Sequence, residues 1–280
     1  MNSAASAEAR LPAVSRASLF FGLFLLATLN AFVGLALRHL EGMGFVAAAL
    51  NLFGVSAILW AALAAGLSIA REGDATEPWR RGDALVAALV VAGALFPVPT
   101  ASAVALTGAS LWTVFTSAPG SPLRRSGLVF LAITGAVLWG RLLLALFSGP
   151  LLALDAVFVA GSLGVEHVGN TLWSTDRATR LIVAPGCSSM QGMSLAIVFW
   201  ATVNQLFRVP FSWGAVAWCA AALAATVAVN VVRIGAMLSF PDHLEALHNG
   251  WGYSLFNWLT LVLVVAIVLF GARREVFGAR

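Results

Sequence analysis

The chain has 280 residues, of which 60% are hydrophobic and only 10% are charged. Soluble domains are nearer half apolar and a quarter charged, so this composition excludes an ordinary soluble protein and indicates an integral membrane protein. The formal net charge of +4 comes from sixteen arginines and no lysine. These arginines do not cluster with aromatic residues as they do on nucleic-acid-binding surfaces. We therefore expect membrane lipid, and no nucleic acid, as a partner.

Eight apolar runs predict the fold class, an all-α polytopic membrane protein that forms a single integral membrane domain over residues 1–280. A transmembrane helix needs about 20 mainly apolar residues. The expected spans are residues 18–37, 44–70, 83–98, 101–117, 127–147, 188–207, 211–235 and 252–271. The first run is longer than a typical signal-peptide core, so we expect it to remain as an anchor.

The third and fourth spans come from one apolar stretch, residues 84–118. As a single helix this stretch would be about 52 Å long, whereas a hydrocarbon core is only about 30 Å thick. Pro97 and Pro99 stand near its middle, and proline stops a regular helix. We interpret the stretch as two short spans, with one long span as the alternative.

Residues 148–186 form the longest segment outside the expected spans. The segment opens with an apolar piece, residues 150–164, which predicts a helix that lies at the membrane interface or re-enters the membrane. Its second half contains Glu166, His167, Asp176 and Arg177, whose polar groups need water or protein contacts.

The arginines are distributed unevenly between the two sides of this eight-span map. Cytoplasmic loops of membrane proteins carry an excess of basic residues. One side, which holds both termini, collects Arg10, Arg16, Arg71, Arg80, Arg81, Arg124, Arg125, Arg208, Arg273, Arg274 and Arg280. The loops of the other side hold only Arg38, Arg177 and Arg180. We therefore expect an inner-membrane protein with both termini in the cytoplasm and residues 148–186 outside.

Cys187 stands where this outer segment meets the sixth span. Pro185 and Gly186 break regular structure just before it, and the serines at 188 and 189 can cap a following helix. The positive end of a helix dipole favours a thiolate over a thiol. Cysteine is also a common packing residue, so this position alone is a weak signal for chemistry.

Arg233 and His248 strengthen the signal, because the map places both at the same outer end. Arg233 lies near the end of the seventh span, where an arginine usually faces the bundle or a wet cavity, although it could also extend to lipid headgroups. Asn230 precedes it by three residues, on the same helix face. His248 lies in the loop before the eighth span. The map thus predicts that a cysteine, an arginine and a histidine from three segments meet at one face.

Glu166 and His167 are one rival acid/base pair. His248 could also be an ordinary loop histidine, as could His243, and Asp242 and Glu245 could merely solvate that loop. Cys219 lies 14 residues before Arg233, about 21 Å deeper along a helix. It is therefore expected to pack in the membrane, out of reach of a disulfide with Cys187.

Three motifs around these residues resemble the signatures of the exosortase/archaeosortase family. They are Ala184-Pro185-Gly186-Cys187-Ser188, then Asn230-Val231-Val232-Arg233, then His248-Asn249-Gly250-Trp251-Gly252 with Phe256 beyond. The likeness covers roughly residues 125–270 as a catalytic core, whereas residues 1–118 look like generic membrane spans. Ser189 departs from the pattern, because the family commonly has glycine there.

The resemblance implies a membrane cysteine transpeptidase that processes exported proteins. In that family the substrate carries a C-terminal sorting signal made of a short motif, a transmembrane helix and a basic cluster, as in PEP-CTERM proteins. Cys187 would be the nucleophile, His248 the general acid/base and Arg233 the group that stabilises the oxyanion. An amine acceptor or water would release the acyl group. The resemblance implies no metal or other cofactor.

Other classes of function remain as alternatives. A polytopic transporter would favour polar residues near the bilayer midplane or related halves, and the sequence has neither. A non-catalytic accessory subunit would explain the apolar bulk but not the meeting of Cys187, Arg233 and His248. A hydrolase with the same site, which cleaves without transfer, is the rival closest to the family's own activity.

Overall fold

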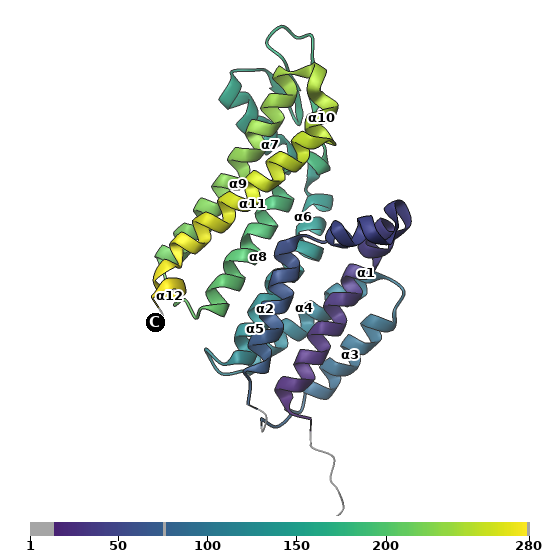
Figure 1. Ribbon diagram of the computed structural model, residues 1–280, viewed down its shortest axis with the longest axis vertical. Coiled ribbons are helices and arrows are strands. Elements are labelled where there is room, and N and C mark those ends of the chain that lie inside the picture. Colours follow the sequence, from purple (N-terminus) through teal and green to yellow (C-terminus); the bar gives the residue numbers. More distant parts are fainter. Residues whose placement is uncertain (1–13, 75–76, 279–280) are drawn as a thin grey trace, which may run out of the picture.

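The computed structural model describes residues 14–74 and 77–278, and these residues are mostly helical (Figure 1). Arg10 and Arg280, two of the arginines counted above, lie outside the described residues. The helices are α1 (Arg16–Leu50), α2 (Ala57–Arg71), α3 (Asp83–Leu95), α4 (Pro99–Thr116), α5 (Pro122–Thr134), α6 (Gly140–Leu146), α7 (Ser148–Leu163), α8 (Met190–Leu206), α9 (Trp213–Ser239), α10 (Leu244–His248), α11 (Trp251–Gly271) and α12 (Arg273–Phe277).

Four helical segments in the described residues are long and apolar enough to cross a membrane. They are α1, the continuous stretch Pro122–Leu146, α9 and α11. The protein is therefore a membrane protein, but the expectation of eight spans is not met. The helices α2 and α3 have 15 and 13 residues, which gives lengths of only about 20 Å.

The turn expected after the first span is also misplaced. We expected a turn at Arg38, His39 and Glu41, but α1 continues through these residues and breaks at Gly44. Gly44 has a φ of 76°, a left-handed conformation that glycine adopts without steric cost. The end of α1 then leaves the bundle sideways at mid-height (Figure 1).

The proline break inside residues 84–118 is confirmed. The helix α3 ends at Leu95, and α4 begins at Pro99. Proline suits the first turn of a helix, where its missing N–H has no partner to lose. Pro122 begins α5 in the same way, and Ser121 caps that helix by accepting from the backbone N–H of Arg124. The stretch from 122 to 146 contains one π-helical turn, Gly135–Trp139.

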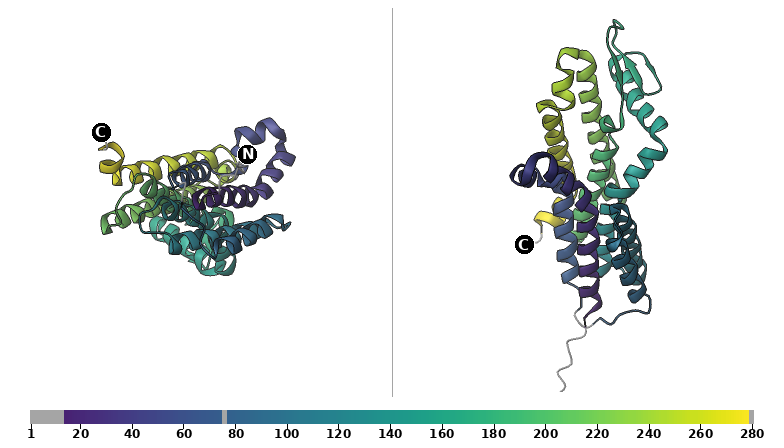
Figure 2. Two further views of the ribbon diagram at one scale, coloured as in Figure 1. Left: turned by 90° about the horizontal axis from the view of Figure 1, so that it is seen from below. Right: turned by 90° about the vertical axis from the view of Figure 1, so that its right-hand side faces the viewer.

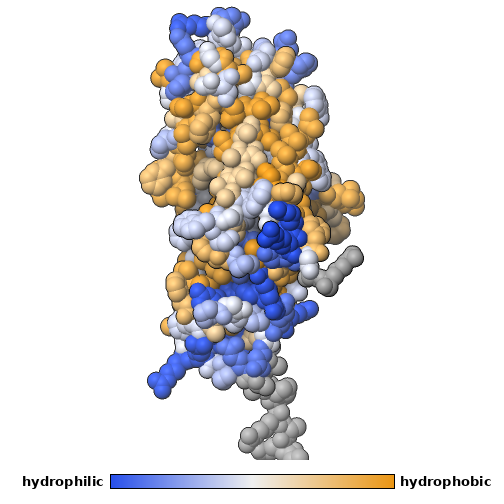
Figure 3. All heavy atoms as spheres, turned by 90° about the vertical axis from the view of Figure 1, so that its left-hand side faces the viewer, coloured by the Kyte–Doolittle hydropathy of each residue, from blue (hydrophilic) through white to orange (hydrophobic). Residues whose placement is uncertain are grey.

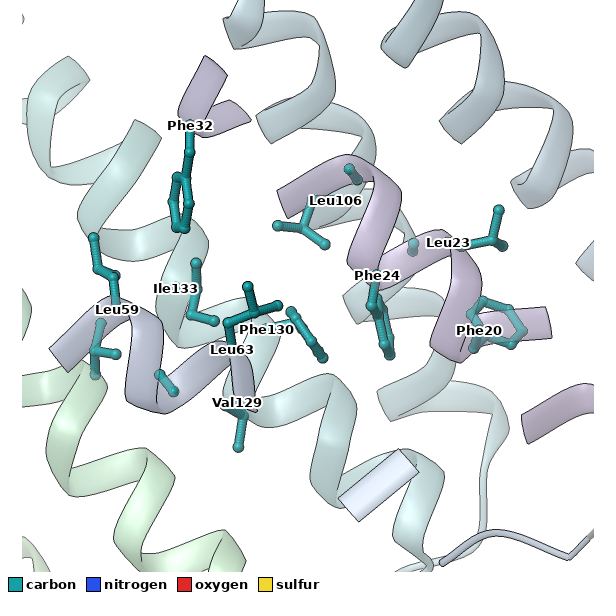
Figure 4. Close-up of a cluster of buried hydrophobic side chains, with 14 of the residues drawn as sticks. Phe20, Leu23, Phe24, Phe32, Leu59, Leu63, Leu106, Val129, Phe130 and Ile133 are labelled. Atoms are coloured by element: carbon teal, nitrogen blue, oxygen red, sulfur yellow. The ribbon is translucent and has the colours of Figure 1, made fainter. Parts of the chain in front are cut away.

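The N-terminal helices pack around an aromatic and aliphatic core. Phe24 of α1 stacks on Phe130 of α5 with ring centroids 4.3 Å apart. Figure 4 shows these rings with aliphatic side chains of α2, α4 and α5 around them. This core holds α1, α2, α4 and α5 together in the lower half of the molecule (Figure 1).

The C-terminal helices rise beyond this bundle to the upper end of the molecule. Helix α9 lies between α11 and α7, as the right-hand view of Figure 2 shows. The labels α7 and α10 mark the upper end in Figure 1. Residues that are far apart in the sequence thereby meet at one end, which is the end that carries the predicted site.

The segment 148–186 departs from the all-α fold class that we expected for the chain. Its first part is helical, as predicted, and forms α7. Its second part forms an antiparallel sheet of three short strands, β1 (His167–Val168), β2 (Thr171–Trp173) and β3 (Arg180–Ile182), in the order β1-β2-β3. Strands of two or three residues are too short to show the alternation of apolar and polar residues by which strands are recognised.

Candidate active site

Cys187 sits on a tight turn between the sheet and α8. The chain leaves β3 at Ile182, and a 3₁₀ turn, Pro185–Cys187, follows in which the backbone N–H of Cys187 donates to the carbonyl of Ala184 at 2.8 Å. Helix α8 begins at Met190, whose N–H donates to the hydroxyl of Ser188 at 3.3 Å. Cys187 thus lies just ahead of a helix N-terminus, and Ser188 helps to cap that helix, both as predicted.

The Cys187 side chain is buried, with only 3% of the residue exposed. It joins an apolar cluster formed by α7, the sheet, α9 and α10, whose buried members include Val159, Leu181, Ile234 and Leu247. The packing excludes water from the thiol, so a reacting group would meet it in a medium of low dielectric constant, where charge interactions are strong.

Asn230 connects α9 directly to this turn. Its side-chain N–H donates to the carbonyl oxygen of Cys187 at 2.8 Å. Asn230 is buried, and so is Arg233 one turn further along the same helix. Both side chains therefore lie on the buried face of α9, and Asn230 contacts the cysteine turn.

The Arg233 guanidinium has no counter-ion among the residues that the structure describes. The side chain is 7% exposed, and its Nε is a buried donor without a hydrogen-bond partner. Its Cζ lies 5.6 Å from the centre of the Tyr253 ring in α11, a cation–π distance. A buried arginine that lacks an anion is energetically costly. A ligand with an acceptor or a negative charge would reduce that cost by pairing with this donor.

His248 ends α10, next to the buried Leu247 that packs in the same cluster as Cys187. The His248 side chain is half-buried. Gly252 allows α11 to start here, because a Cβ at this position would lie 2.8 Å from a Leu247 methyl group. The structure brings the segments of Cys187, Arg233 and His248 together, but within the described residues neither Arg233 nor His248 hydrogen-bonds to the thiol.

Asp155 is a part of this site that the sequence interpretation missed. It lies in α7, is only 3% exposed, and accepts two hydrogen bonds from Ser189: from the backbone N–H at 3.2 Å and from the hydroxyl at 2.7 Å. A single carboxylate in an apolar run is rare and usually functional. This was the feature of the sequence that could have revealed Asp155. Ser189, where the resembled family commonly has glycine, is thus the residue that ties α7 to the cysteine turn.

The rival groups form separate contacts at the same end. Glu166 pairs with Arg177 at 2.6 Å instead of with His167, and both partners are mostly exposed. The pKa of Asp176 is lowered, chiefly by a hydrogen bond from the Ser174 hydroxyl and then by one from the backbone N–H of Ala178. These contacts stabilise the loop between β2 and β3. Within the described residues, no hydrogen bond joins Glu166 to His167.

Cys219 and Cys187 are both free cysteines, and Cys219 lies in α9 toward the lower end. Within residues 14–74 and 77–278, no three His, Cys, Asp or Glu side chains are grouped as they would be to hold a metal ion.

Comparison with known proteins adds no relative to this picture. No family model matches the chain, and no curated protein or solved structure matches it. The functional argument therefore depends on the residues and on the geometry described above.

Proposed function

We propose that this protein is a membrane-embedded cysteine transpeptidase that cleaves C-terminal sorting signals of exported proteins at the outer membrane face. The observation that carries the proposal is the hydrogen bond at 2.8 Å from the Asn230 side chain to the Cys187 carbonyl, which links the cysteine turn to α9. One turn further along α9, Arg233 is buried and its Nε has no partner. A cysteine and an unused cationic donor on linked segments fit acyl transfer.

The proposed first step is attack by the Cys187 thiolate on the carbonyl carbon of the scissile peptide bond. A C–S bond forms, and the carbonyl oxygen becomes an oxyanion that Arg233 stabilises. His248 then donates a proton to the leaving nitrogen, the C–N bond breaks, and a thioester remains on Cys187.

The second step releases the acyl group. An acceptor amine, or water, attacks the thioester carbonyl and gives up a proton to His248, and the C–S bond breaks to return the cysteine. Transfer to an amine leaves a new amide on the substrate, whereas hydrolysis leaves a carboxylate. The mass of the processed C-terminus separates the two outcomes.

An apolar groove that reaches the first turn of α8 suits the membrane-embedded part of such a signal. Its volume is about 450 Å³, and its lining includes Leu131, Gly135 and Trp139 on one wall and Met190 and Met193 of α8 on the other. Met190 is only three residues from Cys187. The wall from Gly135 to Trp139 is the π-helical turn, a feature often found at functional sites.

The charge distribution supports the orientation that the proposal needs. At the end opposite to Cys187, Arg16 pairs with Glu77 and Asp83, and Arg125 and Arg208 both pair with Glu72. Loops rich in arginine stay in the cytoplasm. The proposed location is the plasma membrane, with both termini inside and Cys187 outside.

The test is the size of a co-expressed exported protein that carries a C-terminal short motif, apolar helix and arginine cluster. Cys187→Ala should abolish its processing, and Cys187→Ser should be nearly as inactive because a hydroxyl ionises far less than a thiol. Loss of the acid/base in His248→Ala should slow processing by about 10²–10⁴-fold, and loss of Arg233 by about 10²–10³-fold.

Cys219→Ala is the matched control, since it removes the other thiol from the same chain. It should process the reporter at the wild-type rate, and all variants should reach wild-type levels in the membrane. Normal processing by Cys187→Ala would show that the cysteine is a packing residue and that the proposed function is wrong.

A further inference from the structure

The small sheet ahead of Cys187 ends in a strand with a free edge. The strand order is β1-β2-β3, so β3 is hydrogen-bonded to β2 on one side only. In the part of the chain that the structure describes, no strand lies against its other side. A free edge of this kind presents a row of main-chain donors and acceptors to an incoming chain.

The register of the sheet shows which residues face this edge. The N–H of Val183 donates to the carbonyl of Asn170 at 2.8 Å, and the N–H of Ser174 donates to the carbonyl of Thr179 at 2.9 Å. Hydrogen-bonded pairs alternate along an antiparallel ladder. Leu181 therefore faces its partner in β2, whereas the main-chain groups of Arg180 and Ile182 point away from the sheet.

The side chains of these two residues leave the edge accessible. Arg180 and Ile182 are both exposed, and 52% of Ile182 is accessible, whereas Leu181 between them is buried in the cluster around Cys187. The buried residue fixes the strand against the core, and within the described residues no loop or turn hydrogen bond uses the outward N–H and C=O groups on either side of it.

The free edge leads directly to the cysteine turn. Cys187 is the fifth residue after Ile182, so the two are at most about 17 Å apart along an extended chain. Asn170 holds the first part of this connection, because its side-chain N–H donates to the carbonyl of Val183 at 2.9 Å. An extended peptide of about six residues, at about 3.3 Å per residue, would reach from the edge to the thiol.

We infer that the substrate segment just before the scissile bond binds as a fourth strand on the free edge of β3. Its main chain hydrogen-bonds with Arg180 and Ile182, and the added strand carries the scissile carbonyl to Cys187. Strand addition to a sheet edge gives affinity through main-chain bonds and selects side chains at alternate positions. The residues after the scissile bond then lead into the apolar groove along α8. This inference rests on the proposed function and adds the way in which the substrate is held.

The first test changes one main-chain N–H of the edge. Ile182→Pro removes the outward N–H without removing a bond to β2, and proline is tolerated in edge strands when its nitrogen faces away from the sheet. Ile182→Ala removes more of the side chain than Ile182→Pro does, but it keeps the backbone N–H. We expect Ile182→Pro to yield about tenfold less processed reporter than Ile182→Ala, with both variants at equal levels in the membrane. Equal processing by the two variants would overturn the inference.

A second test leaves this protein unchanged and so does not depend on how a variant folds. Proline is placed in turn at each of the six reporter residues before the cleavage site. Strand addition predicts that processing falls at alternate positions, where the reporter N–H bonds to the edge, and is retained at the positions between them. Uniform tolerance, or uniform loss, would contradict a paired strand.

The outcome for Cys187→Ala keeps the two proposals separate. If that variant processes the reporter, the transpeptidase function itself fails. If it is inactive while Ile182→Pro and Ile182→Ala process the reporter equally, only the strand-addition inference fails.

Discussion

Asp155 fixes the turn that carries Cys187 by accepting both hydrogen bonds that Ser189 donates. The two residues are 34 positions apart and both are buried. Ser189 immediately precedes α8, where the positive end of the helix dipole favours a carboxylate. The pairing gives both carboxyl oxygens of Asp155 a hydrogen-bond partner in an apolar setting, and it sets the position of the turn relative to α7.

We expect Asp155→Ala to destabilise the protein and to reduce processing. The substitution leaves a buried N–H and a hydroxyl of Ser189 without an acceptor, at a cost of about 1–3 kcal/mol. Asp155→Asn should cost less, because its amide oxygen still accepts. The midpoint of thermal unfolding in detergent and the reporter blot measure the two effects. Asp242→Asn, a change at an exposed carboxylate of the same end, should stay within about 0.5 kcal/mol of the wild type. A similar midpoint for Asp155→Ala and Asp242→Asn would contradict this role.

The residues of the site differ in how well the sequence revealed them. Asn230 and Arg233 are polar groups three residues apart near the end of an apolar run, so helical spacing predicted their shared face. Asp155 has no such partner nearby, and its link to Ser189 exists only in three dimensions. His248 was predicted to meet Cys187 at one face, and α10, which His248 ends, does pack in the same cluster. The position of its side chain depends on how α10 and α11 pack around Gly252.

At the scale of the helices, a buried ion pair connects the lower ends of α1, α3 and α4. Arg16 is fully buried and donates to Asp83 at 2.9 Å, to Thr116 at 2.6 Å and to Ser117 at 3.0 Å. Asp83 also accepts from the indole N–H of Trp112 at 2.6 Å. These contacts satisfy both charges and tie three helices together at one point.

We expect removal of one partner of this pair to destabilise the bundle strongly. Arg16→Met or Asp83→Asn leaves an uncompensated buried group, which costs about 3–5 kcal/mol. The double variant should cost less than the sum of the two, because each substitution removes the same interaction. The measurement is the midpoint of unfolding in detergent for each of the three variants. Arg81→Met, at an exposed arginine two residues before Asp83, should be near neutral, and additive losses in the double variant would rule out direct coupling.

The helices themselves were predictable where the chain carries a local stop signal. The prolines predicted the break between α3 and α4, whereas α5 begins at Pro122, earlier than the expected span 127–147. The continuation of α1 was not predictable from charge, because Arg38, His39 and Glu41 are compatible with a helix that leaves the bundle. The break depends instead on the backbone of Gly44, and the sheet after α7 depends on pairing between strands of two or three residues.

Over the whole molecule, polar residues are concentrated at two ends with apolar surface between them. Figure 3 shows hydrophilic residues at the upper end, a broad hydrophobic band below it, and further hydrophilic residues over the lower part. The upper end carries the sheet, α10 and the cysteine turn, and the lower part carries the ion pairs of Arg16, Arg125 and Arg208. The arginine count predicted this division into two unlike ends, because charge asymmetry is a property of loops and does not require helix lengths to be correct. The predicted number of spans was wrong, because that number depends on where each helix begins and ends.

The last prediction concerns which of these ends faces the outside of the cell. Ala118 lies in the loop between α4 and α5, and Ala178 lies between β2 and β3; both are exposed, so each can be replaced by cysteine at little cost. In a background with Cys187→Ala and Cys219→Ala, a membrane-impermeant maleimide added to intact spheroplasts should label Ala178→Cys and spare Ala118→Cys. Permeabilised membranes should label both and so control for reactivity. The reason is that the arginine-rich end holds Ala118, and moving arginine loops across a membrane is disfavoured. Labelling of Ala118→Cys from outside would contradict the proposed orientation of the arginine-rich end. Labelling of Ala118→Cys without Ala178→Cys would place Cys187 in the cytoplasm, where an exported substrate could not meet it.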